Sequence, residues 1–393
     1  MNTLYRKKLR RVLFIFKTLL YLFILILSLL LKVFKKYRDI WIISERGDDA
    51  RDNGYYFFEY LMSQRNRPDV YYIIDKKSSD YTKIKEYTNV IHRGSLKHWL
   101  YFCLARIKIS THIMGYSPDR YLFTWLDKYL GIVFGKKVFL QHGITKDNIK
   151  ALHYPNVKLD LFICGTAPEF NYVLKNFGHP KGVVKYTGLA RFDNLHDFDV
   201  NRQILLMPTW RQYLKGCSES EFKLSEYFKR YTSLICSDSL HWLLEHYDYK
   251  LIFYPHYEMQ KYIHLFSSNH PRIAIAGFAD YDVQKLLMES ALLITDYSSV
   301  FFDFAYMKKP VIYYQFDYDT FRKKHYNEGY YDYCTMGFGN VVATEDDLIN
   351  SVKAIVNADC AMSEEYKRIA DSFFKLNDKT NCERIYNCIL NLT

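Results

Sequence analysis

The sequence predicts an α/β protein with two doubly wound, Rossmann-like domains that face each other across a central cleft. The 393 residues are too many for one ordinary hydrophobic core. Short apolar, β-rich runs alternate with helical stretches in two successive series, which is typical of parallel sheets covered by helices on both faces. A polar stretch without either period, residues 189–202, separates the two series.

Residues 1–38 form a basic, apolar segment that we expect to anchor the chain at a membrane. They carry ten Lys and Arg residues and no acid, whereas the whole chain has a net charge of +11. The rest of the chain is therefore close to neutral, so the net charge does not indicate a nucleic-acid partner. A charge asymmetry of this kind indicates anionic membrane lipid as a partner.

An apolar run of twenty residues, 12–31, lies between the basic clusters and contains one charge, Lys17. As a helix it would be about 30 Å long, which matches the hydrocarbon thickness of a membrane. Both flanks are basic, so their charge does not choose an orientation. The segment either spans the membrane or lies in the inner leaflet, and we favour an anchor at the cytoplasmic face of the cell membrane.

The first predicted domain comprises residues 39–198. Apolar runs predict strands at 39–44, 70–75, 108–113, 137–143, 159–165 and 182–188, and helices at 55–64, 96–105 and 168–177. The second predicted domain comprises residues 199–393, with strands at 203–210, 249–256, 272–277, 292–298 and 310–317. The eight cysteines form no C-x-x-C pair, which is typical of reduced thiols in a reducing compartment.

Polar side chains follow several strands of the second domain, at the edge where doubly wound sheets bind their ligands. Thr209 and Arg211 follow one strand, His256 follows another, and a third ends in "ITDYSS". Ser298 and Ser299 in that stretch can cap the next helix, beside free backbone N–H groups that suit a phosphate. Ordinary helix capping is the alternative interpretation. The chain contains neither a P-loop nor a dinucleotide-binding fingerprint.

The first domain offers His142, which ends an apolar strand and precedes Gly143. A histidine in that place can act as a general base near neutral pH. His142 and Asp147 also fit the H-x-x-x-x-D pattern of membrane acyltransferases, in which the aspartate orients the histidine. The carboxylate pairs at 197 and 199 and at 317 and 319 are typical of solvated loops, and we predict no metal site from them.

Six motifs in order, "QHGITKDN", "YTGLARFDNL", "LLMPTWR", "YPH", "LLITDYSSVFFDFAYMKKPVIYY" and "FDYDTFR", resemble the CDP-glycerol glycerophosphotransferase family of teichoic acid and capsular polymer synthesis. The resemblance runs from about residue 40 to residue 375. It implies a GT-B fold and peripheral association with the inner membrane face. It also implies transfer of glycerol phosphate from CDP-glycerol to a membrane-linked glycan or polymer, with release of CMP and without a metal or other cofactor.

The resemblance further implies roles for individual residues. His142 would be the base for the acceptor hydroxyl, and His256, in its protonated form, would contact the donor phosphates. The residues expected to hold the donor pyrophosphate are Arg211, Thr295, Ser298, Ser299 and Arg322, and those expected near its glycerol or ribose are Thr209, Asp296 and Asp303. His256 precedes Tyr257 where the family usually has proline, and "ARFDN" stands where the family often has "PRND".

Three alternatives stay open at this point. The first is a GT-B glycosyltransferase that uses a nucleotide sugar, and the second is an acyltransferase built on His142 and Asp147. The third is a non-catalytic scaffold of a wall or capsule assembly. The sequence also leaves open whether the polyol is glycerol or ribitol, how many units are added, which lipid-linked glycan accepts them, and the oligomeric state.

Overall fold

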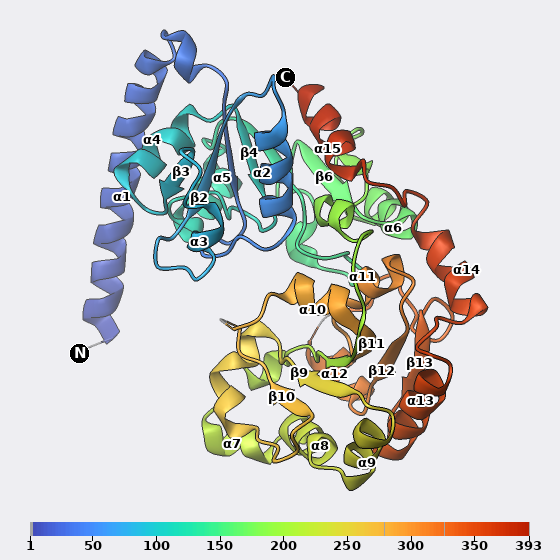
Figure 1. The fold of residues 1–393 in the computed structure, drawn as a ribbon. Helices are drawn as coiled ribbons and strands as arrows, with labels where there is room; N and C mark the ends of the chain where they lie inside the picture. Colours follow the sequence, from blue (N-terminus) through green and yellow to red (C-terminus); the bar gives the residue numbers. More distant parts are fainter. Residues whose placement is uncertain (1–2, 279, 326, 393) are drawn as a thin grey trace.

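A computed structural model describes residues 3–278, 280–325 and 327–392 and contains two α/β domains, one above the other (Figure 1). The first domain is built on a seven-stranded parallel sheet in the order β3-β2-β1-β4-β5-β6-β7. Its strands are β1 (Ile40–Ser44), β2 (Asp69–Ile74), β3 (Val90–His92), β4 (Ile107–Ser110), β5 (Lys136–Phe139), β6 (Leu161–Cys164) and β7 (Val184–Tyr186).

Helices cover both faces of this sheet, because the inner strand β1 carries apolar side chains on both sides. Trp41 and Ile43 of β1 pack with the residues of α2, whereas Ile40 and Ile42 pack with those of α4 and α5. The helices of the domain are α2 (Asn53–Ser63), α3 (Tyr81–Ile84), α4 (Leu96–Leu104), α5 (Arg120–Leu130) and α6 (Ala167–Asn176), with 3₁₀ turns η1 (Lys35–Tyr37), η2 (Lys150–Leu152) and η3 (Ala190–Asn194).

The second domain is built on a six-stranded parallel sheet in the order β10-β9-β8-β11-β12-β13. Its strands are β8 (Asn201–Leu206), β9 (Lys250–Phe253), β10 (Ile273–Ile275), β11 (Ser290–Thr295), β12 (Val311–Tyr314) and β13 (Gly339–Val342). Its helices are α7 (Glu219–Leu224), α8 (Glu226–Ile235), α9 (Asp238–His246), α10 (Val283–Glu289), α11 (Phe301–Tyr306), α12 (Tyr318–Lys324), α13 (Glu345–Asn357) and α14 (Glu364–Phe373), with η4 (Gln212–Leu214) and η5 (Tyr257–Leu265).

The predicted fold class is therefore confirmed, with differences at the strand ends. The sequence missed the two short edge strands β3 and β13. Several predicted strands also extended too far into the polar residues that follow them. The strand predicted at 137–143 ends at Phe139, and Gln141 adopts a left-handed conformation with φ 61° that no strand can accommodate. His142 consequently lies in a loop beyond the strand.

The chain returns to the first domain at its end. The helix α15 (Asn381–Leu390) packs against α2, β6 and η3 beside the first sheet (Figure 1). Asp193 of η3 accepts hydrogen bonds from the backbone N–H groups of Asn381 and Cys382, at 2.9 and 2.8 Å. Part of the segment that we predicted as the second domain, residues 199–393, is thus packed on the first sheet.

The first helix, α1 (Thr3–Leu31), lies along the outside of the first domain (Figure 1). Residues 11–31 are long and apolar enough to cross a membrane, judged by length and composition. One side of the helix is packed on the domain: Tyr21 is buried and donates to the carbonyl of Ile132 at 2.5 Å, and Phe14 meets Trp125 at a ring distance of 5.3 Å. The opposite side exposes Ile15, Phe16, Leu19, Leu22, Phe23, Ile26, Leu29 and Leu30.

Candidate active site

His142 follows β5 and is accessible to solvent at the side of the first domain that faces the second. Its imidazole stacks on that of His112, with ring centroids 4.5 Å apart. Desolvation by the surrounding protein, together with the charges of Arg191 and Arg46, lowers the pKa of His142 to about 4. A hydrogen bond with the Thr111 backbone opposes this shift. His142 is therefore neutral at pH 7, with one ring nitrogen held by Thr111 and the other able to accept a proton.

The hydroxyl cluster of the second domain meets the loop of His142 at Gly143. Ser298 and Ser299 belong to the loop between β11 and α11, and a Cβ added at Gly143 would collide with the Ser299 hydroxyl. Neither serine caps α11, whose N-cap is Val300 without a side-chain hydrogen bond. In the described part of the chain, neither hydroxyl nor any amide of residues 298–301 has a hydrogen-bond partner. These groups are therefore available to an anionic ligand, which differs from ordinary capping.

His256 follows β9 in the same domain. Its Nδ1 accepts a hydrogen bond from the backbone N–H of Glu258 at 3.2 Å, so the proton of the neutral ring is on Nε2. Burial, together with Arg46, His142 and His325, lowers the pKa of His256 to about 3. Our expectation that His256 is protonated is therefore wrong for the protein without a ligand. A neutral His256 can still donate one N–H to a phosphate oxygen.

Arg211 does not line the cleft, which corrects the expected direct contact with phosphate. Its side chain is 0% exposed, and its guanidinium donates to both carboxylate oxygens of Asp317 at 2.7 and 2.9 Å. It also donates to Asp296 and to the carbonyl of Thr209, each at 2.9 Å. Arg211 thus joins the residues that follow β8, β11 and β12. Its positive charge offsets the cost of burying the carboxylates of Asp296 and Asp317.

Four other predicted site residues are also engaged within the protein. Thr295 is buried and donates to the carbonyl of Met207 at 2.7 Å, and Asp296 accepts from the backbone N–H of Thr209 at 2.8 Å. Asp303 is buried against Arg191. These residues, like Thr209, are held by contacts within the protein. The buried carboxylates of Asp296 and Asp303 cannot contact glycerol or ribose directly in this conformation.

Arg322 of α12 does not stay with the expected donor site of its own domain: it reaches across the domain boundary and pairs with Asp147 of the first domain at 2.8 Å. Asp147 also pairs with the neighbouring Lys146 at 2.5 Å, and no hydrogen bond joins it to His142 in the described residues. The acyltransferase alternative required Asp147 to orient His142. The structure removes that basis, because both oxygens of Asp147 are held by cations instead.

Arg191 of η3 is a central residue to which the sequence analysis gave no role, although it lies in the quoted "ARFDN" stretch. It donates to both oxygens of Asp303 at 2.6 and 2.9 Å, to Asp52 at 2.8 Å and to the carbonyl of His142 at 3.2 Å. It therefore links the loop of His142 to the second domain. Arg191 lies in the irregular stretch between the domains, where neither periodicity nor a strand end marks it.

Arg46 is a second missed residue. It follows the end of β1, pairs with Asp49 at 2.7 Å, and places its guanidinium 4.6 Å from the ring centre of Tyr257 in the other domain. Its charge lowers the pKa of both His142 and His256, so this one guanidinium acts on both imidazoles. The rule that polar residues at strand ends mark the site could have found Arg46, because it occupies such a position.

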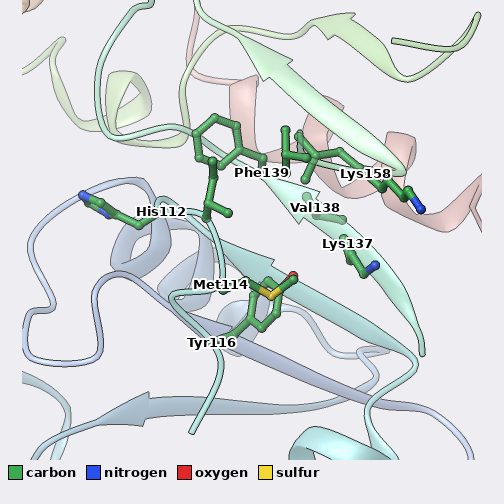
Figure 2. A pocket seen from close by; sticks show the side chains of 10 residues that line it. His112, Met114, Tyr116, Lys137, Val138, Phe139 and Lys158 are labelled. Atoms are coloured by element: carbon green, nitrogen blue, oxygen red, sulfur yellow. The ribbon is translucent and has the colours of Figure 1, made fainter. Parts of the chain in front are cut away.

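A separate small pocket lies behind His112, between the β4–α5 connection and β5 (Figure 2). Its lining is mostly apolar, with Met114, Tyr116 and Phe139 beside Lys137 and Lys158. It has room for about one water molecule and does not include His142 or the serines. The pocket is too small for a nucleotide.

Metal ligands are not grouped at the site. In residues 3–278, 280–325 and 327–392, no three His, Cys, Asp or Glu side chains lie together in a way that could hold a metal ion. Asp317, one of the paired carboxylates noted in the sequence, is held by Arg211.

The two facing parallel-sheet domains define a GT-B-like protein. The chain superimposes on the solved structure of the wall teichoic acid polymerase TagF with a TM-score of 0.67 and 17% identity, covering 100% of both chains. A TagF variant soaked with CDPG matches with a TM-score of 0.66 and 18% identity, covering 98% of this chain and 96% of that one. This likeness shows the fold.

Sequence similarity gives the family. Residues 25–391 match the profile of CDP-glycerol:poly(glycerophosphate) glycerophosphotransferases, and the chain belongs to that family. It is also 36% identical over 371 residues to the minor teichoic acid biosynthesis protein GgaB of Bacillus subtilis (strain 168). That alignment covers 90% of this chain and 40% of GgaB, so the chain spans less than half the length of this relative.

Proposed function

We propose that this chain transfers a polyol phosphate, most favourably glycerol phosphate, from a CDP-activated donor to a lipid-linked glycan or polymer during teichoic acid or capsular polymer synthesis. Membership of the glycerophosphotransferase family supports this proposal, as do the teichoic acid relatives and the CDPG soak of TagF. The observation that carries it is the apposition of Gly143 and Ser299. This apposition supports a site in which the loop of a neutral histidine adjoins hydroxyl and amide donors that have no partner among the described residues.

The donor would lie on the second domain. Ser298, Ser299 and the amides around them would donate hydrogen bonds to the diphosphate oxygens, and Nε2–H of His256 would add another donor. Arg46 would replace Arg211 as the cation of this site, because it is the guanidinium near both histidines. Such pre-placed donors stabilise charge that develops on phosphate oxygens in the transition state.

The reaction then follows from the free nitrogen of His142. The acceptor hydroxyl gives its proton to this nitrogen while its oxygen forms a bond to the β-phosphorus of the donor. The bond between the β-phosphorus and the bridging oxygen breaks, and CMP leaves with the electron pair. A base in this place contributes about 10²–10⁴-fold to the rate.

A donor panel tests the proposal. Purified full-length protein in detergent, with an acceptor extract, would be given CDP-glycerol, CDP-ribitol, UDP-N-acetylglucosamine or an acyl donor, with and without EDTA. We expect CMP release from a CDP-polyol, loss of that release in His142→Ala, and no effect of EDTA, because the proposed mechanism uses no metal. Release of UDP alone would favour the glycosyltransferase alternative, and EDTA inhibition would contradict the metal-free mechanism.

We also propose that α1 binds the surface of an anionic membrane on its cytoplasmic face and does not span it. The helix is packed on α4 and α5 along one side, through Phe14, Tyr21 and Ile24. Crossing the membrane would require this side to leave the domain. Its other side exposes a continuous apolar stripe flanked by exposed basic residues, including Arg11, Lys35 and Lys36. These features suit a helix that lies in the plane of the interface.

A further inference from the structure

Glu169 is a buried carboxylate that the reaction itself does not use. It lies in the first turn of α6 with 0% exposure, and it has no ion-pair partner among the described residues. Its Oε1 accepts hydrogen bonds from the backbone N–H of Thr145 at 2.5 Å and from Nε2 of Gln141 at 2.9 Å. Its Oε2 accepts from the backbone N–H of Gly165 at 2.7 Å. Burying a charged carboxylate without a cation costs free energy, so the hydrogen bonds to Glu169 have to offset that cost.

Gln141 occupies the centre of the same network. It has a left-handed backbone with φ 61°, which is unfavourable for a residue with a Cβ. Its side-chain amide donates to Glu169 and to the carbonyl of Ile163 at 2.6 Å, and its Oε1 accepts from the hydroxyl of Thr145 at 2.5 Å. Its own carbonyl accepts from Asn53 at 2.8 Å. Every polar group of the Gln141 side chain is therefore used to hold this conformation.

The loop held in this way carries the catalytic histidine. Gln141 and Thr145 are the two ends of the segment 141–145, and both are bonded to the single carboxylate of Glu169. Between them lie His142, whose carbonyl is held by Arg191, and Gly143, which meets Ser299. A shift of either end would move the imidazole relative to the donor site.

We infer that Glu169, acting through Gln141 and Thr145, is the positioning residue that fixes the His142 imidazole opposite Ser298 and Ser299. The inference rests on the proposed function for its kinetic consequence, but the placement of His142 does not. The N–H groups of Gln141, Thr145, Gly165 and Thr166 that face Glu169 require both of its oxygens as acceptors. The ionised form fits this requirement, because a proton on either oxygen would face an N–H donor.

The protonation of Glu169 supplies a distinctive pH signature. Burial raises the pKa of Glu169 to about 7, whereas that of His142 is about 4. The titratable groups that face Glu169 are Cys164 and Tyr330, and both are kept neutral at pH 7 because their pKa values are raised by burial. As pH falls through about 7, Glu169 gains a proton and the loop loses an acceptor, so turnover should fall well above the pKa of the base.

Stability should change in the opposite direction. The pKa of Glu169 is higher in the folded protein than in the unfolded chain, so the folded state binds this proton more tightly. The contribution of Glu169 to stability is therefore present at low pH and is lost as pH rises through about 7. A purely structural residue would give parallel changes in activity and stability, whereas a positioning carboxylate gives opposed ones.

The test compares wild-type protein with Glu169→Gln, with Thr145→Val as a second variant of nearly unchanged shape, and with the exposed Glu365→Gln as control. We expect kcat for CMP release to fall about 10–100-fold in Glu169→Gln with KM for CDP-glycerol within about twofold, because the base is displaced and the donor site is not. The acid limb near pH 7 should also disappear from the pH profile of this variant. Thr145→Val should lower kcat less, and Glu365→Gln should match wild type.

A second readout does not depend on the reaction. The rate at which diethyl pyrocarbonate modifies His142 at pH 7.5, followed by peptide mass spectrometry, should change severalfold in Glu169→Gln and Thr145→Val, while the rate at His256 stays constant. Unchanged modification of His142 in both folded variants would overturn the inference, as would a wild-type pH profile in Glu169→Gln. If wild-type protein released no CMP from any donor while His142 reactivity still depended on Glu169, the proposed function would fail and the positioning role would stand.

Discussion

Gly143 and Ser299 belong to different domains, yet they face each other so closely that a side chain on Gly143 would force the Ser299 hydroxyl to move. A Cβ at this position would lie 3.4 Å from Cβ of Ser299 and would collide with its hydroxyl. One apolar cluster runs between the two domains, from Ile144 and Leu189 to Tyr297 and Phe301, and holds them in this arrangement. The loop of His142 and the hydroxyls of Ser298 and Ser299, the proposed base and donor site, therefore meet at a packed boundary.

Gly143→Ala should lower CMP release by about 10–100-fold, because the new methyl group must displace the Ser299 hydroxyl or move His142. In a Ser299→Ala background the same substitution should cost much less, because its nearest obstacle is gone. The four rates form a double-mutant cycle measured under identical conditions. Additive effects of the two substitutions would show that the two residues do not meet in solution.

The two histidines should differ in what they contribute. His142→Ala should lower kcat about 10²–10⁴-fold and leave the affinity for CDP almost unchanged, because the donor is held by the other domain. His256→Ala should weaken CDP binding about 10–100-fold, since it removes a donor to a charged group worth about 1.5–3 kcal/mol. Isothermal titration calorimetry with CDP separates the two cases. Equal loss of CDP affinity in both variants would contradict this division.

Substitution of Arg211 should mainly lower the stability of the fold, whereas substitution of Arg46 should mainly weaken donor binding. Arg211→Met leaves Asp296 and Asp317 buried without their cation and should lower the free energy of unfolding by about 3–5 kcal/mol. Arg46→Met should change stability by less than about 1 kcal/mol, because its ion pair is partly exposed. Denaturant unfolding measures both.

The second variant also has an electrostatic signature. Because the charge of Arg46 lowers the pKa of His142 and His256, Arg46→Met should raise both pKa values and weaken CDP binding about tenfold. Histidine NMR titration and calorimetry follow these changes. A variant with unchanged histidine titration and full CDP affinity would remove Arg46 from the proposed donor site.

The exposed side of α1 should control membrane binding without affecting the fold. Replacing Leu19, Phe23 and Ile26 by Gln should abolish flotation with phosphatidylglycerol vesicles, because these side chains are more than 60% exposed and form the outward stripe. The melting temperature should stay within a few degrees of wild type. The exposed Leu224→Gln in the second domain is the matched control. Full retention on vesicles by the triple variant would show that another surface binds the membrane.

The sequence was sufficient where the required property is local. The alternation of apolar strands and helices predicted two parallel sheets, and eleven strands were found close to their predicted places. His142, His256, Ser298 and Ser299 follow strands as predicted, and the carboxyl ends of parallel strands meet at one edge of a sheet. The twenty apolar residues of 12–31 likewise predicted the helix α1.

Only the tertiary structure decided which polar residues face the cleft and which support it. Arg211, Asp296 and Asp303 have the same residue types and strand-end positions as ligand-binding groups, yet each is buried against an opposite charge. Arg191, Glu169 and Gln141 hold His142 through partners up to 139 residues away in the chain. A linear pattern can place a charge at a strand end. Whether that charge meets a ligand or a counter-ion depends on contacts between distant segments, and these form only when the domains pack.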